Sequence, residues 1–142
     1  WKYENYLRSS ESPYAAAMSL AEFVANTPKT RLSIEHIYPQ NPKQVHVVED
    51  QSILPPATKE FQEGWLHSLG SLTLDPLKAN MEKTNNEFEV KNSRFFCRAP
   101  YKTQNELDLF MGSTSRWDET AIAKRRDKIL DFALQYWKYQ DV

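Results

Sequence analysis

The sequence predicts an α+β fold that is mostly helical, with a core of two short strands and a helix, surrounded by further helices. Glycine is scarce, with 3 in 142 residues, whereas there are seven phenylalanines, seven tyrosines and four tryptophans. This mixture favours helices over a turn-rich β-sandwich. Two short stretches, residues 31–38 and 71–74, have the pattern of strands.

The first strand is expected over residues 31–38, because its apolar residues are β-branched or aromatic and Pro39 lacks the N–H needed to continue it. Glu35 and His36 are consecutive near its end, so their side chains point to opposite faces and reach different partners. A carboxylate is a ligand for a hard divalent cation, and an imidazole that titrates near neutral pH suits a general base. The alternative is a surface glutamate and a half-buried histidine.

The second strand is expected over residues 71–74, after a tight bend at Gly70, and it should stop at Asp75-Pro76. A polar, proline-punctuated loop precedes it from residue 40 to residue 64. Helices are expected at residues 1–8 and 20–25, near 59–63, from Asn80 through Phe88 and Phe95, after Thr103, and over 118–139. Two of these helices begin with capping boxes, Ser19 with Glu22 and Thr103 with Glu106.

The net charge of −1 does not indicate a nucleic-acid-binding protein, but its distribution is uneven. Residues 76–104 contain six Lys or Arg and three Asp or Glu, so this segment is a candidate phosphate-facing surface, or else an ordinary solvated face. No apolar run approaches membrane-spanning length, and Cys97 is the single cysteine, which excludes an internal disulfide. A cytoplasmic location is expected.

The order of motifs resembles the HNH branch of the ββα-metal nucleases. It is most similar to the C-terminal nuclease domain of GmrSD-type modification-dependent restriction enzymes and related phage-defence proteins. The similarity runs from about residue 30 to the C-terminus. The matching residues are Ile34-Glu35-His36-Ile37-Tyr38-Pro39-Gln40-Asn41, Trp65, Leu69-Gly70-Ser71-Leu72-Thr73-Leu74, Asn80, Asn86-Glu87-Phe88 with Lys91, Trp117, Ile122 with Arg125, and Trp137.

The resemblance implies a metal-dependent DNA endonuclease with a ββα-metal (HNH) core. His36 would be the general base that takes a proton from water. Glu35 and Asn80 would hold one divalent metal, Mg²⁺ or alternatively Mn²⁺, because few protein ligands and several waters suit these ions. The alternative for Asn80 is a simple N-cap of its helix, and the two roles can coexist. Flanking phosphates would be held by Lys91, Arg94 and Arg125. The alternatives are a solvated helix lysine for Lys91 and, for Arg125 or Arg126, a buried ion-pair partner of an acid.

The resemblance also implies the surroundings of this domain. DNA would be the substrate, and an N-terminal sensor or NTPase domain of the full-length protein would supply recognition and control in restriction or phage defence. Residues 1–29 would be a helical lead-in from that part, and residues 30–142 the nuclease domain. His46 and His67 lack partners at a recognisable spacing and are assigned surface or packing roles, with His67 a second candidate functional histidine.

Ser71 departs from the family pattern. The family typically has Gly-Asn-Leu where this chain has Gly70-Ser71-Leu72. That asparagine is expected to pin the loop and orient the base, and a serine hydroxyl is shorter and lacks the two ends of an amide. Two other functions therefore remain open. The first alternative to the nuclease is a DNA-binding module with a weakened site. The second is a helical protein-interaction domain with an exposed apolar patch.

Overall fold

Two antiparallel strands lie at the centre of the fold. The computed structural model describes residues 1–24, 31–41, 58–112 and 116–137. Strands β1 (Leu32–His36) and β2 (Leu72–Pro76) pair with His36 opposite Leu72. The second strand extends through the predicted stop at Asp75-Pro76, and the next amide, Leu77 N–H, donates to the Arg31 carbonyl at 2.8 Å. Proline is tolerated there because it ends the strand.

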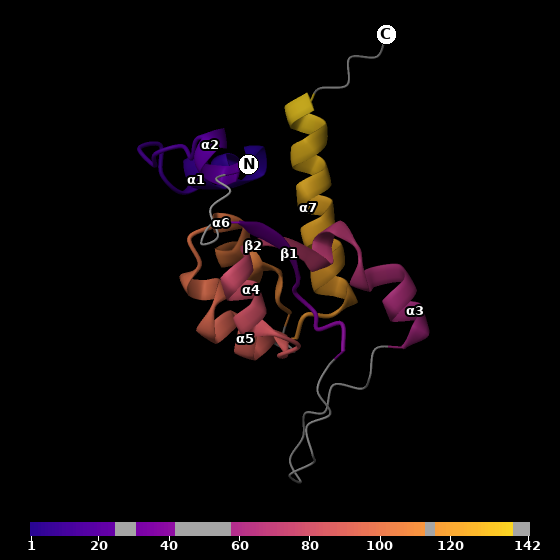
Figure 1. The fold of residues 1–142 in the computed structure, drawn as a ribbon. Helices are drawn as coiled ribbons and strands as arrows, with labels where there is room; N and C mark the ends of the chain where they lie inside the picture. The colour runs from indigo at the N-terminus through magenta and orange to yellow at the C-terminus, as the bar shows by residue number, and fades with distance from the viewer. Residues whose placement is uncertain (25–30, 42–57, 113–115, 138–142) are drawn as a thin grey trace.

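Helices surround the strands, so the predicted α+β, mostly helical architecture is confirmed (Figure 1). In that view the long α7 and the pair α4 and α5 flank the two strands, and α1 and α2 lie near α6. No helix within the described residues is long and apolar enough to cross a membrane. The helices are α1 (Lys2–Glu11), α2 (Leu20–Val24), α3 (Lys59–Phe61), α4 (Leu77–Lys83), α5 (Phe88–Arg94), α6 (Lys102–Asn105) and α7 (Glu119–Trp137). A short π-helical segment occupies Gln62–Leu66. Short 3₁₀ helices occupy Leu69–Ser71, Phe96–Arg98 and Glu106–Phe110.

One of the two predicted capping boxes is confirmed. Ser19 Oγ accepts from Glu22 N–H at 3.1 Å, and Glu22 accepts from Ser19 N–H at 2.7 Å. The prediction at Thr103 is wrong. The first amides of α6 are instead capped by Glu4 of α1, which accepts from the backbone N–H groups of Lys102 and Thr103 at 2.9 Å each. Glu4 is fully buried, so this cap also fastens α1 to the rest of the domain.

The prediction that Asn80 opens a helix is also wrong. Helix α4 begins three residues earlier, directly after Pro76, whose φ of −56° suits the residue before a helix. Asn80 therefore lies inside α4. The predicted continuous helix breaks at Thr84, which has a φ of +49°, and a separate α5 begins at Phe88.

The core lies between the strands and the helices. Of the three tryptophans that match the family pattern, Trp117 is buried, Trp65 is half-buried at the edge of the core and Trp137 is 66% exposed. The buried apolar residues are Ile37, Tyr38, Leu66, Phe88, Phe96, Leu107, Phe110, Trp117, Ala121 and Ile122. Ile37 and Tyr38 directly follow β1, so the core holds the strand that carries Glu35 and His36.

A buried ionic cluster ties the second strand to two helices. Asp75 of β2 lies 2.5 Å from Lys83 Nζ of α4 and accepts a hydrogen bond from Gln104 Nε2 of α6 at 2.6 Å. All three side chains are almost completely buried. The cluster satisfies each charge internally, as buried charges require.

Candidate functional site

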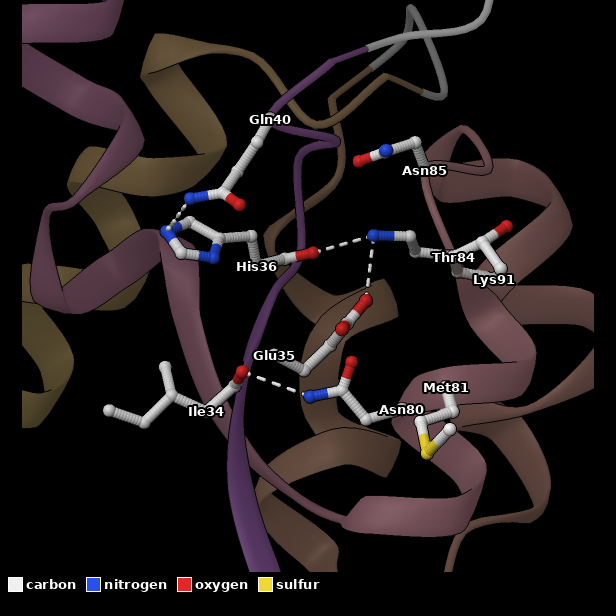
Figure 2. Close-up of a pocket in the computed structure, with 9 residues that line it drawn as sticks. All are labelled: Ile34, Glu35, His36, Gln40, Asn80, Met81, Thr84, Asn85 and Lys91. Atoms are coloured by element: carbon white, nitrogen blue, oxygen red, sulfur yellow. Dashed lines mark hydrogen bonds and ion pairs between the residues drawn. The ribbon is translucent and has the colours of Figure 1, made fainter.

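A hollow of about 270 Å³ lies beside the end of β1. Its walls come from β1, the turn after it, α4 and α5 (Figure 2). The hollow brings together Glu35, His36 and Asn80, the three residues expected to carry the chemistry. The lining residues are Ile34, Glu35, His36, Gln40, Asn80, Met81, Thr84, Asn85 and Lys91.

Glu35 and Lys91 form a buried ion pair in this hollow. Lys91 Nζ lies 2.6 Å from Glu35 Oε1 and donates to the His36 carbonyl oxygen at 2.7 Å (Figure 2). Burial raises the pKa of Glu35, and the nearby ammonium of Lys91 opposes that rise. Burial likewise lowers the pKa of Lys91, against the attraction of Glu35. Each charge therefore depends on the other to remain ionised.

His36 makes its polar contacts through one ring nitrogen. Its Nε2 lies 3.0 Å from Nδ1 of His67 and 3.2 Å from the side-chain nitrogen of Gln40. Figure 2 shows the imidazole and the Glu35 side chain on opposite sides of β1, as expected for consecutive strand residues. Burial, followed by His67 and Lys91, lowers the pKa of His36 below its usual 6.5. The imidazole is therefore neutral at pH 7, which is the form that accepts a proton.

This lowered pKa predicts how stability depends on pH. The folded protein resists protonation of His36, and the unfolded chain takes up that proton near pH 6.5. Between the lowered pKa and pH 6.5 the unfolded state binds more protons, so the free energy of unfolding should fall as the pH falls. Urea unfolding at several pH values in EDTA should show a steeper fall for the wild type than for His36→Asn. Parallel curves would contradict the assignment.

Asn80 has a fixed amide orientation. Its Nδ2 donates to Ser33 Oγ at 2.9 Å and to the Ile34 carbonyl at 3.0 Å, both on β1. These two bonds use both amide protons. Figure 2 shows the amide oxygen on the side of Glu35. Asn80 thus presents an oxygen, and not its NH₂ group, beside the buried carboxylate.

The oxygen donors suit a small, hard cation. Glu35 supplies a carboxylate and Asn80 a neutral amide oxygen, the donor types that Mg²⁺ and Mn²⁺ accept. Within the described ranges, no three His, Cys, Asp or Glu side chains group in a way that could hold a metal. These residues therefore fit an ion that keeps several waters and takes few protein ligands.

Ser71 does not line the hollow. It is fully buried, and its carbonyl accepts from Ile37 N–H at 2.9 Å, which joins the turn to the end of β1. Its hydroxyl has no hydrogen-bond partner among the residues that the structure describes. Ser71 therefore holds the loop through its backbone, and no contact of its hydroxyl orients His36.

Arg125 takes the buried, ion-paired position that was the alternative to a phosphate contact. Its Nη1 donates to the carbonyl oxygens of Leu72 at 2.7 Å and Gly70 at 3.1 Å, and its side chain is buried. Glu106 Oε1 lies 3.6 Å from Arg125 Nε and balances the charge of the guanidinium. Arg125 fastens the turn before β2 to α7, and this geometry does not fit the expected contact with a phosphate.

The expected basic surface is reduced for the same reason. Lys83 and Lys91 are buried in internal ion pairs, and Lys102 lies 2.6 Å from Glu11. Of the three residues expected to bind DNA, Arg94 is exposed at the end of α5, whereas Lys91 and Arg125 are buried. Exposed positive charge in residues 76–104 is therefore smaller than the composition suggests.

His67 and Gln40 are the site residues that sequence analysis undervalued. Gln40 is four residues beyond His36, and His67 directly follows the Gln62–Leu66 segment. Gln40 belongs to the matched stretch around His36 but was given no role there, and His67 has no motif spacing relative to His36. His67 reaches His36 because the strand pairing places Leu72 opposite His36, so the residues just before β2 return to the end of β1. The strand register is the signal that could have located it.

Comparison with known proteins identifies the family of this chain. The family model described as GmrSD restriction endonucleases, C-terminal domain, matches residues 3–132. A search of curated proteins and a search of solved structures each gave no match. The family match spans nearly the whole chain, including β1, β2 and all the residues around the hollow. The chain therefore belongs to the family of GmrSD restriction endonuclease C-terminal domains, the nuclease domains of a restriction system.

Proposed function

We propose that this domain cuts DNA by metal-assisted hydrolysis of a phosphodiester bond, with His36 as the general base. The convergence of Glu35, His36 and Asn80 on one hollow is the observation that carries the proposal. Had the carboxylate and the amide stood far apart, a single site for base and metal would not exist. A protein-interaction role alone would not require this convergence.

His36 takes the proton from the attacking water. Its neutral form is favoured by burial, and Nδ1 is the ring nitrogen that is not engaged by His67 or Gln40. Because Lys91 donates to the carbonyl of His36, the backbone of the base is held in place during the reaction. A positioned general base contributes about 10²- to 10⁴-fold to the rate.

Glu35 and Asn80 would hold the metal, Mg²⁺ or Mn²⁺. When bound, the ion supplies positive charge for the phosphate and for the departing oxygen. Asn80 contributes its oxygen in an orientation set by its two bonds to β1. Lys91 neutralises part of the charge of Glu35 and therefore weakens the affinity for a cation.

DNA binding would depend on more than this chain. Its net charge is −1, and Arg94 is the remaining expected phosphate contact with an exposed side chain. Non-specific affinity for DNA comes mainly from neutralised phosphates, and few exposed cations supply little of it. This supports an N-terminal sensor or NTPase domain that delivers the DNA and controls cleavage.

The test is cleavage of supercoiled plasmid with Mg²⁺ or Mn²⁺. Nicking by the wild type should require the metal, and His36→Ala should reduce the rate by about 10²-fold or more. Lys78→Met is a control for a substitution away from the hollow. The Lys78 side chain is 81% exposed, and its Nζ lies 4.0 Å from Glu82 Oε1 on the surface. Equal metal-dependent rates for the wild type and His36→Ala would remove His36 as the base.

The second candidate is a DNA-binding module with a weakened site, and the buried, unpartnered hydroxyl of Ser71 favours it. If the wild type binds plasmid without cutting it and Ser71→Asn cuts, the fold and site are those of the nuclease and position 71 limits activity. If neither protein cuts but both bind DNA, the binding function stands alone.

A further inference from the structure

His67 contacts the candidate base directly. The two rings lie with their centroids 5.0 Å apart and their planes at 82°, and His67 Nδ1 is 3.0 Å from His36 Nε2. This is a hydrogen-bond distance between two ring nitrogens. In a neutral pair, one of these nitrogens carries a proton and the other accepts it.

The direction of this hydrogen bond decides whether His36 works as a base. If His36 Nε2–H donates to His67 Nδ1, the lone pair of His36 is on Nδ1, the ring nitrogen that is not engaged by His67 or Gln40. If His67 donates instead, the proton of neutral His36 sits on Nδ1 and blocks that nitrogen. A partner that accepts from Nε2 therefore sets the productive tautomer.

We propose that His67 is a positioning residue, which accepts a hydrogen bond from His36 Nε2 and so holds the base in the tautomer whose lone pair is on Nδ1. The inference rests on the proposed function in one respect, the role of His36 as the base. It gives His67 the orienting task that the hydroxyl of Ser71 does not perform. The contact requires no motif spacing, because the strand register brings the two rings together.

Gln40 fits the same arrangement. Its side-chain nitrogen is 3.2 Å from His36 Nε2, which would place two donors face to face in the proposed tautomer. An amide rotated by half a turn presents its oxygen at nearly the same point. Gln40 and His67 then both accept from the single proton on Nε2. Lys91 of α5 is a further charged group that acts on the ring.

The first experiment measures the tautomer without requiring cleavage. The chain has three histidines, so long-range ¹H–¹⁵N correlation spectra of the ¹⁵N-labelled protein at pH 8 in EDTA are readily assigned with His36→Ala and His67→Ala. We expect His36 to carry its proton on Nε2 and that proton to exchange slowly with water. It should exchange rapidly in His67→Ala. In His67→Asn, whose side-chain oxygen replaces Nδ1 as acceptor, exchange should remain slow.

A proton on His36 Nδ1 in the wild type, or equal exchange in the wild type and His67→Ala, would overturn the proposal. His67 is exposed, so neither variant should disturb folding. Where the domain cuts plasmid, His67→Ala should lower kcat by about 10- to 100-fold, the range for partners that orient a site residue, with little change in KM. His67→Asn should recover most of that loss. Equal kcat values for His67→Ala and His67→Asn would contradict a hydrogen-bonding role.

Discussion

Replacing Gly70 by alanine is expected to lower the free energy of unfolding by about 3 kcal/mol or more. A Cβ at Gly70 would lie 2.0 Å from the carbonyl oxygen of Ile122 and 3.0 Å from the backbone nitrogen of Arg126, both in α7. These are backbone atoms of a packed helix, so the turn and α7 would have to separate. Urea denaturation followed by tryptophan fluorescence would measure the loss.

Gly64→Ala is the matched control. A Cβ at Gly64 would meet no atom within 4 Å, and Gly64 lies inside the helical segment Gln62–Leu66. Alanine is more favourable than glycine in a helix by about 0.5–1 kcal/mol, so this variant should be as stable as the wild type or slightly more stable. Similar losses for the two variants would mean that the contact between the turn and α7 is not the cause.

Replacing Lys91 by methionine is expected to cost about 3–5 kcal/mol at pH 8, because it leaves the buried carboxylate of Glu35 without its cation. The side chains of Lys91 and Glu35 are 2% and 5% exposed, so water cannot replace the lost partner. The cost should be smaller at pH 5, where Glu35 is more easily protonated. The sign follows from the raised pKa of Glu35. The folded variant binds more protons than the unfolded chain above about pH 4.5, so its stability falls as the pH rises.

Two further variants separate this structural role from a phosphate contact. Adding Glu35→Gln to Lys91→Met should restore much of the stability, because the uncompensated charge is removed. Lys78→Met, at an exposed position, should change stability by less than about 0.5 kcal/mol. If Lys91→Met instead kept the wild-type stability and lost only DNA binding, Lys91 would be a phosphate contact after all.

Local sequence patterns predicted the parts of the fold that depend on local physics. The strand around Glu35 and His36, the capping box at Ser19, and α7 each follow from residues close together in the chain. The convergence of Glu35, His36 and Asn80 could be anticipated only through the order of motifs. Asn80 itself was misplaced within its helix, because Pro76 and not Asn80 marks the start of α4.

Contacts between distant residues could not be predicted from such patterns. The cap of α6 comes from Glu4, nearly a hundred residues away, so Thr103 was given a role that it does not have. The sequence places Lys91 on a solvated helix face and one of Arg125 and Arg126 near the packed side, and only the packed structure shows the carboxylate and the carbonyl oxygens that bind Lys91 and Arg125. The sequence indicates a bend at Gly70. The structure shows that glycine is needed there mainly because the backbone of α7 approaches too closely for a side chain.

The hydrogen bonds from Arg125 to the turn before β2 have a consequence for synthesis of the protein. A ribosome delivers the chain from its N-terminus, so β1, β2 and α4 emerge before α7. Until residue 125 has been added, the carbonyl oxygens of the turn before β2 lack the guanidinium that binds them, and the turn lacks the helix against which it packs. The end of β1 is joined to that same turn. A translation product that stops short of α7 is therefore expected to lack the packed turn that holds the end of β1, and with it a formed hollow beside Glu35 and His36.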